Sequence, residues 1–178
     1  MNILDQLSTE HREAERLMAQ LAETDAGEQR ATLVGELTAQ LHQHMAVEEQ
    51  FLYPIVTAVI GDEPATEGRN EHDLARAGLV SMDELAAVPG FSAALEMVKA
   101  GLAHHVHDEE SDMFPRLRRD AADQIDALDH DLLAAWVDEQ ASLDPTRDEL
   151  YERAQDIDVP GRSSMTKAEL AEATAEGP

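Results

Sequence analysis

The sequence contains no cysteine, few aromatic residues and few basic residues. Without cysteine the chain has no disulfides, no thiolate metal ligands and no thiol nucleophile, so any metal ion must be held by histidine and carboxylate. Aromatic residues make up 3% of the 178 residues, and 38 acidic residues against 13 basic ones give a formal net charge of −25. This excess of negative charge disfavours nucleic acid and anionic membrane surfaces as partners.

Long apolar segments are absent as well. No run reaches the roughly 18 apolar residues that a membrane-spanning helix needs. The start of the chain, MNILDQLSTEH, has neither a basic segment nor a long apolar core, so we expect no signal peptide. We therefore expect a soluble, cytoplasmic protein, and the low aromatic content with abundant Ala, Leu and Glu favours an all-α fold.

Four stretches of the chain carry apolar residues at alternating spacings of three and four, which is typical of amphipathic helices. They are separated by turn signals at Thr24–Gly27, Gly61–Gly68 and Val88–Gly90. Four such helices with short connections predict an all-α fold, an antiparallel up-down-up-down four-helix bundle.

The chain beyond the bundle divides into two further parts. We expect the four-helix bundle over residues 1–120, an additional helix that packs on it over 121–141 and contains Trp136, and a small C-terminal tail over 145–178. The tail has a helix–extended–helix pattern, and Thr166 with Glu169 forms a capping box that opens its second helix.

The most informative feature is an internal repeat with an offset of 61 residues. LHQHMAVEEQFLYP (Leu41–Pro54) recurs as LAHHVHDEESDMFP (Leu102–Pro115), and the same offset places Glu10–His11 on Glu71–His72. One offset relates both helix pairs, so the bundle is predicted to be a duplicated helix pair. Each half then supplies a lone histidine from its first helix and a His-x-x-x-Glu motif from its second.

Residues at i and i+4 project from the same face of a helix, one turn apart. A single His-x-x-x-Glu motif is usually a surface pair, but burying six such residues without partners would cost several kcal/mol each. Facing halves would let Glu48 and Glu109 bridge two metal ions, for which iron is best suited, with manganese or zinc as alternatives. Glu49 and Glu110 also recur, either to support the ligands or as a solvated face. The candidate metal ligands are His11, His44, Glu48, His72, His105 and Glu109.

The order His, His-x-x-x-Glu, His, His-x-x-x-Glu, with the forms HxxxEExxLYP and HxxxEExxMFP, resembles the hemerythrin-like (HHE cation-binding) family. The resemblance covers about Met1–Asp120. It implies a four-helix bundle with a non-haem centre of two iron ions, bridged by an oxo or hydroxo oxygen, and it assigns the six candidate ligands to that centre.

Two positions depart from the family pattern or from the repeat. Oxygen-carrying hemerythrins have a further histidine one turn after the lone histidine of the third helix, but Arg76 stands there, and its repeat mate is Glu15. This departure disfavours reversible O₂ carriage and favours reaction with O₂, hydrogen peroxide or nitric oxide. Tyr53 stands where the second half has Phe114, and it is either a catalytic residue near the irons or an aromatic plug at a helix end.

Three other histidines lie off the inward faces and are expected to face solvent or a partner: His42, His104 and His107. His104 and Asp108 also have i, i+4 spacing, but the repeat favours His105 and Glu109 as the ligand pair. A ferritin-like site is disfavoured because it uses Glu-x-x-His, with glutamate first and a spacing of three.

The sequence thus predicts a di-iron protein that binds or reacts with a small diatomic or peroxide ligand, with catalase-like peroxide turnover or nitric oxide reaction as its enzymatic form. The alternative is an oxygen, redox or iron sensor that signals to a protein partner through its C-terminal tail, and a structural zinc site is a third hypothesis. The tail resembles small modules of the SAP and Rho N-terminal type, some of which bind nucleic acid. Its Arg153, Arg162 and Lys167 are few against the net charge of −25, so we expect a docking element instead.

Overall fold

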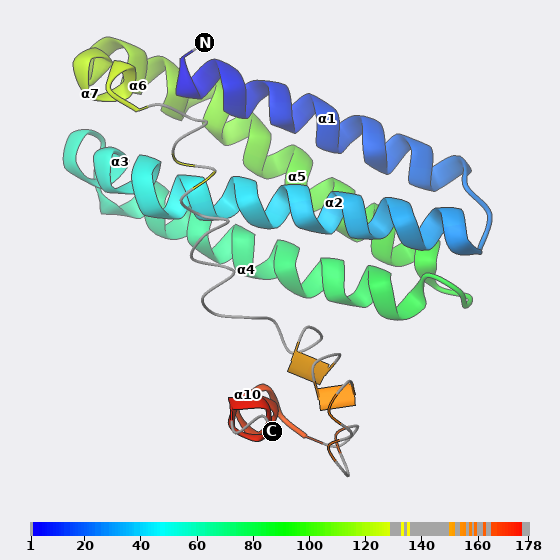
Figure 1. Cartoon of the computed structure of the whole chain (residues 1–178). Helices are drawn as coiled ribbons and strands as arrows, with labels where there is room; N and C mark the ends of the chain where they lie inside the picture. The colour runs from blue at the N-terminus through cyan, green and yellow to red at the C-terminus, as the bar shows by residue number, and fades with distance from the viewer. Residues whose placement is uncertain are drawn as a thin grey trace. The chain divides into compact units, whose positions relative to one another are not determined.

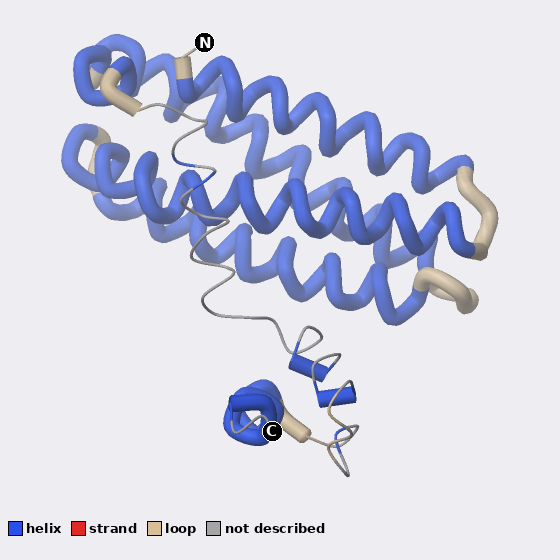
Figure 2. The backbone as a smooth tube through the Cα atoms, viewed as in Figure 1, coloured by secondary structure: helices blue, strands red, loops and turns tan. Residues whose placement is uncertain are grey.

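The computed structural model describes residues 2–128 and, beyond them, residues 133, 135, 150, 151, 154, 155, 157, 159, 162 and 165–175. The chain divides into two units, Met1–Ala134 and Ala135–Pro178, and each is described by itself. Figure 2 shows helices and loops, and no strand occurs among the described residues. The predicted all-α class is therefore confirmed.

Four long helices form the body of the first unit: α1 (Ile3–Glu23), α2 (Glu28–Val47), α4 (Asp62–Leu85) and α5 (Phe91–Asp108). They lie side by side, and the α1–α2 and α4–α5 loops are at the same end (Figure 1). Helix α1 packs against α2 and α5, and α4 packs against α5 and α2. Each helix thus buries one face against two neighbours, which makes the unit a helical bundle.

The predicted turn-rich connection over Gly61–Gly68 is wrong, because α4 already begins at Asp62. Ile60 and Gly61 form the connection, and Gly61 has a φ of 134° that favours glycine. Pro64 lies in the first helical turn, where its missing N–H has no partner to lose. Asp62 and Glu63 also suit a helix N-terminus, since their charges complement the helix dipole.

Two of the long helices continue beyond a wider turn. Helix α2 runs through a π-helical segment, η1 (Glu48–Leu52), into α3 (Tyr53–Val59), and α5 runs through η2 (Glu109–Met113) into α6 (Phe114–Asp120). In η1 the Tyr53 N–H donates to the carbonyl of Glu48, five residues back, and in η2 Phe114 does the same to Glu109. π-Helical turns inside helices are frequent at functional sites.

An apolar core fills the half of the bundle near the α1–α2 and α4–α5 loops. It includes Met18 and Leu21 at the end of α1, Leu37 in α2, Met82 at the end of α4 and Leu95 near the start of α5. The candidate ligands lie further from these loops along each helix, and the apolar core reaches them at Met45 and Val106. No helix among the described residues is long and apolar enough to span a bilayer.

Within the predicted additional helix over 121–141, the structure shows the short helix α7 (Ala122–Asp126), and Ala127 and Leu128 after it are not helical. Most of its remainder, including Trp136, lies outside the described residues, and the predicted domain limits near 120 and 145 stay predictions. In the second unit, Leu150, Ala154 and Leu170 form a small buried cluster.

The predicted capping box of the second unit is confirmed. It opens α10 (Lys167–Ala175), and the Thr166 N–H donates to Glu169 Oε2 at 2.8 Å. In return, the Glu169 N–H donates to Thr166 Oγ1 at 3.3 Å. The two contacts satisfy backbone groups at the start of the helix.

Candidate metal centre

The structure brings all six predicted ligands together in the interior of the bundle. None of the six is more than 4% exposed: His11, His44, Glu48, His72, His105 and Glu109. One is supplied by α1 and one by α4, whereas the two His-x-x-x-Glu motifs lie where α2 meets η1 and where α5 meets η2. Their ligand atoms form two groups, within each of which all atoms lie within 4.8 Å of one another.

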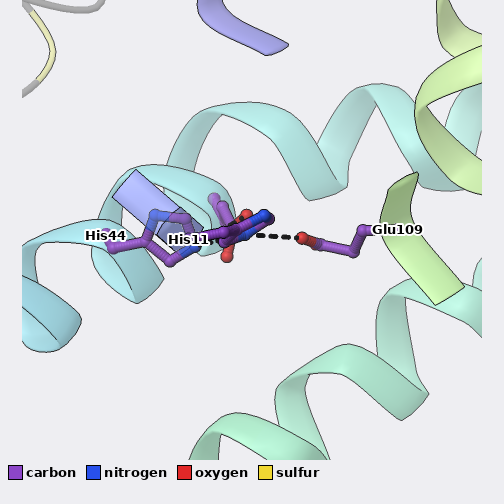
Figure 3. Close-up of side chains that lie close together, drawn as sticks. His11, His44 and Glu109 are labelled. Atoms are coloured by element: carbon purple, nitrogen blue, oxygen red, sulfur yellow. Dashed lines mark hydrogen bonds and ion pairs between the residues drawn. The ribbon is translucent and has the colours of Figure 1, made fainter. Parts of the chain in front are cut away.

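The first group consists of His11, His44, Glu48 and Glu109. The Nε2 atoms of His11 and His44 are 3.1 Å apart. His44 Nε2 lies 3.3 Å from Glu48 Oε1, and His11 Nε2 lies 3.4 Å from Glu109 Oε2, the contact that Figure 3 marks with a dashed line. Two imidazole nitrogens and two carboxylates thus converge on one point.

The second group consists of Glu48, His72 and His105. The Nε2 atoms of His72 and His105 are 3.2 Å apart, and His72 Nε2 lies 3.2 Å from Glu48 Oε2. Glu48 therefore belongs to both groups and turns one oxygen toward each. Glu109 Oε2 lies 3.5 Å from His105 Nε2, so Glu109 also stands between the two pairs of histidines.

A carboxylate holds the other ring nitrogen of every histidine in the cluster. Each pairing joins Nδ1 to a carboxylate oxygen: His11 to Glu110 at 2.9 Å, His44 to Glu10 at 2.8 Å, His72 to Glu49 at 2.8 Å and His105 to Glu71 at 2.9 Å. A carboxylate can only accept here, so it fixes the proton on Nδ1 and leaves the Nε2 lone pair directed at the centre. This is the usual environment of a metal-ligating histidine.

The sequence predicts Glu49 and Glu110 only as candidates for such support and assigns no role to Glu10 or Glu71. The signal for all four was in the repeat, because Glu10 recurs as Glu71 and Glu49 as Glu110. What the sequence did not reveal is the pairing. Glu10 and Glu71 hold histidines of their own half, whereas Glu49 and Glu110 hold histidines of the other.

Arg76, at the position where oxygen carriers have a further histidine, does not reach into the centre. Its guanidinium donates to Glu49 Oε1 at 2.8 Å, and Arg12 donates in the same way to Glu110. Burial by itself raises the pKa of Glu49, but the hydrogen bonds from His72 and Arg76 outweigh it and lower that pKa. His72 and Arg76 thus keep Glu49 charged.

Three buried oxygens of the centre lack hydrogen bonds. Both oxygens of Glu48 and Oε2 of Glu109 accept none from the described residues, although imidazole nitrogens lie 3.2 to 3.5 Å away. Burying a carboxylate without donors costs several kcal/mol in real proteins. Metal ions between these oxygens and the inward nitrogens would remove that cost, and a set of imidazole and carboxylate ligands suits iron, manganese or zinc.

The charges of the centre without metal follow from the same geometry. Burial alone would lower the pKa of His44, but the charge of Glu48 and the hydrogen bond to Glu10 raise it to about 10. Burial alone would also lower the pKa of His105, but the charge of Glu109 raises it to about 11. Burial raises the pKa of Glu48, yet the adjacent His44 charge holds it well below its ordinary value. Without metal, the raised pKa values of His44 and His105 therefore favour the protonated forms of these two imidazoles.

Tyr53 lies at the edge of the second group and is fully buried. Its hydroxyl is 3.2 Å from His72 Nε2 and donates to Glu109 Oε1 at 3.4 Å. Burial, followed by the negative charges of Glu48 and Glu109, raises the pKa of Tyr53. The phenol thus keeps its proton and acts as a donor beside the centre.

The two halves differ at this point. The ring of Tyr53 stacks on His72, and the ring of its repeat mate Phe114 stacks on His11 without contributing a hydroxyl. A side chain on Gly68 would overlap the Tyr53 hydroxyl and bring a Cβ within 2.8 Å of Tyr53 Cζ. The Tyr53 hydroxyl can therefore occupy its place only because residue 68 is glycine. The offset of 61 pairs Gly68 with Leu7 in the first half.

An apolar cavity of about 540 Å³ leads to the histidines between α2, α4 and α5. Its walls include Leu41, Gly78 and Met97, and its lining also contains the site histidines His72 and His105. The histidines predicted to lie away from the centre are exposed, as expected: His42, His104 and His107.

A helical bundle with a buried cluster of imidazoles and carboxylates is typical of helical proteins that bind cations. The family model of the hemerythrin HHE cation binding domain matches residues 2–117. Because this match covers more than half of the chain, the protein belongs to the hemerythrin HHE cation-binding family. No curated protein and no solved structure matches the chain significantly.

Proposed function

We propose that the protein is a hemerythrin-like non-haem di-iron protein that binds or reacts with a small oxidant, namely hydrogen peroxide, nitric oxide or O₂. The observation that carries this proposal is the set of three buried carboxylate oxygens without hydrogen bonds, placed among four imidazoles whose Nε2 atoms point inward. Bound iron would supply redox chemistry toward such ligands.

The six ligands divide between two ions. His11 and His44 would hold one ion, and His72 and His105 the other. Glu48 would bridge them, since its two oxygens face histidines of different groups, and Glu109 would bridge from the opposite side. The four supporting carboxylates would keep the imidazoles in the tautomer that binds metal.

We further infer that the bundle has the up-down-up-down order and arose from a duplicated helix pair. The repeated geometry supports this inference: the His11–His44 and His72–His105 rings have the same centroid separation of 4.7 Å and interplanar angles of 67° and 63°. The π-helical segments also begin at Glu48 and Glu109, which are 61 residues apart.

The apolar cavity favours a small uncharged ligand, because such a molecule can pass through it to the histidines. A charged molecule would have to give up its hydration to enter an apolar cavity. Tyr53 would then act from the second group, where its hydroxyl can donate a proton or hydrogen bond to a ligand near His72. Since Arg76 replaces the histidine found in oxygen carriers, reaction is favoured over reversible storage.

The direct test is iron content, followed by reaction of the iron-loaded protein with hydrogen peroxide and with nitric oxide. We expect two irons per chain, near-ultraviolet charge-transfer absorption and a spectral change with at least one of the two reagents. If the spectrum of the iron-loaded protein changes with none of the three, hydrogen peroxide, nitric oxide or O₂, the proposed reactivity is contradicted.

The alternative, a sensor that signals through the tail, has one supporting observation. The second unit packs a buried cluster of its own, with Leu150, Ala154 and Leu170 at its centre. Deletion from Asp144 onward separates the two functions. Loss of a cellular response with unchanged oxidant chemistry would favour the sensor.

A further inference from the structure

A second cluster of metal-ligating side chains lies outside the buried centre. Glu71 on α4 and His104 and Asp108 on α5 each offer one ligand atom within 4.8 Å of the others. His104 Nε2 is 3.7 Å from Glu71 Oε1, and His104 Nδ1 is 3.5 Å from Asp108 Oδ2. The side chains of His104 and Asp108 are 63% and 47% exposed, so ions in solution can reach them.

Glu71 connects this outer cluster with the centre. Its Oε2 accepts the Nδ1 proton of His105 at 2.9 Å, while Oε1 of the same carboxylate faces His104. The outer cluster is therefore one carboxylate away from a predicted ligand of the buried centre.

An acidic cavity of about 310 Å³ is lined by residues of both the outer cluster and the centre. Glu71 and Asp108 contribute to its lining, and so do His105 and Glu109 from the centre. Glu109 is 1% exposed, and its Oε2 accepts no hydrogen bond within the part of the chain that the structure describes. The cavity is thus lined both by two residues of the outer cluster, Glu71 and Asp108, and by a buried carboxylate of the centre, Glu109. The surplus of negative charge along it concentrates cations.

The repeat indicates that the centre itself does not require the outer cluster. The offset of 61 pairs His104 with Gln43 and Asp108 with Val47, and Val47 is buried. All ligands of the centre recur in both halves, and Glu71 recurs as Glu10, whereas His104 and Asp108 have no counterpart in the first half. They are an addition to one face of a duplicated bundle.

We propose that Glu71, His104 and Asp108 form a binding site for a divalent transition metal ion and that this ion passes through the acidic cavity to the buried centre. One imidazole and two carboxylates suit Fe²⁺, Mn²⁺, Co²⁺ and Zn²⁺. Water completes the coordination at so exposed a site, so the ion is held loosely enough to move on. The delivery role rests on the proposed metal centre, but binding at the outer site does not.

The binding step is tested with Co²⁺ as the probe on metal-loaded, full-length protein. The variants are His104→Gln, which installs the residue of the repeat mate, and Asp108→Asn, with His42→Gln as a matched control that removes another exposed histidine. We expect wild type and control to bind one additional Co²⁺, and both test variants to bind it at least about tenfold more weakly, the scale on which ligand supports act. Equal Co²⁺ affinity in wild type and His104→Gln would overturn the outer site.

The delivery step is tested by the rate of Fe²⁺ uptake into metal-depleted full-length protein whose helical content is intact. His104→Gln should fill the centre about tenfold more slowly than wild type or His42→Gln, with the same final iron content, because it loses a ligand of the outer site. Equal rates would overturn delivery. If no variant, wild type included, takes up iron, the proposed function fails together with delivery. The Co²⁺ titration, carried out on the same full-length protein without iron, then still decides on the outer site by comparing wild type with His104→Gln.

Discussion

Replacement of Glu10 by glutamine tests the role of the supporting carboxylates. Glu10 Oε2 accepts the Nδ1 proton of His44 at 2.8 Å, and only 13% of its side chain is exposed. Glutamine has the same shape but no charge, and its amide can present N–H₂ to Nδ1 instead. That orientation would favour the tautomer of His44 with its proton on Nε2, the nitrogen that we propose binds metal.

The magnitude follows from this contact. A hydrogen bond to a charged group is worth about 1.5–3 kcal/mol, and the low exposure places this one within that range. Removing a partner of a metal-ligating histidine typically lowers metal affinity about 10- to 100-fold, or about 1.4–2.8 kcal/mol. We therefore expect Glu10→Gln to weaken metal binding by about this factor while the helical fold persists.

The assay is competition for metal against a chelator of known affinity, with circular dichroism as the check on folding. Glu13→Gln is the matched control, because Glu13 is exposed on the same helix and its replacement makes the same change in charge. Equal metal affinity in Glu10→Gln and Glu13→Gln would refute the reasoning, since the charge would then matter and the contact with His44 would not.

Three further changes probe the centre. Tyr53→Phe should slow peroxide consumption roughly 100-fold at unchanged iron content, the scale of a positioned proton donor; an unchanged rate would reduce Tyr53 to an aromatic plug. Gly68→Ala should destabilise the fold by about 1–3 kcal/mol in denaturant unfolding because its Cβ would lie 2.8 Å from Tyr53 Cζ. Gly35→Ala, with no described atom within 4 Å of the new Cβ, should not destabilise it, and equal effects would refute the crowding argument. The pKa of His44 is raised from 6.5 to about 10, so its stabilising contribution is complete below pH 6.5 and is lost as the pH rises toward 10. The thermal midpoint of metal-free protein should fall over that range, and a constant midpoint would contradict the raised pKa.

The sequence was sufficient to predict the helices and the six clustered residues because both depend on spacing. Apolar residues three and four apart specify one face of a helix, and His44 with Glu48, four apart, specify a point on that face. The offset of 61 then indicated which of several histidines face inward, and in the structure His105 is buried whereas His104 is exposed.

Features that depend on contacts between helices could not be predicted in the same way. The pairing of Glu49 with His72 joins different halves of the bundle, so no local pattern encodes it. The fit of the Tyr53 hydroxyl beside Gly68 is likewise a matter of packing between α3 and α4. The connection after Gly61 was mispredicted because turn-forming residues are also well tolerated in the first turn of a helix.

The most direct test of the central claim is the metal content of protein purified from iron-replete cells, compared between wild type and Glu48→Ala. Glu48 contributes to both groups of ligands, so its loss should affect both ions. We predict two irons per chain with near-ultraviolet charge-transfer absorption in wild type, and a loss of most iron and absorption in the variant. One zinc ion per chain, or no metal in a protein that keeps its helical fold, would contradict the account.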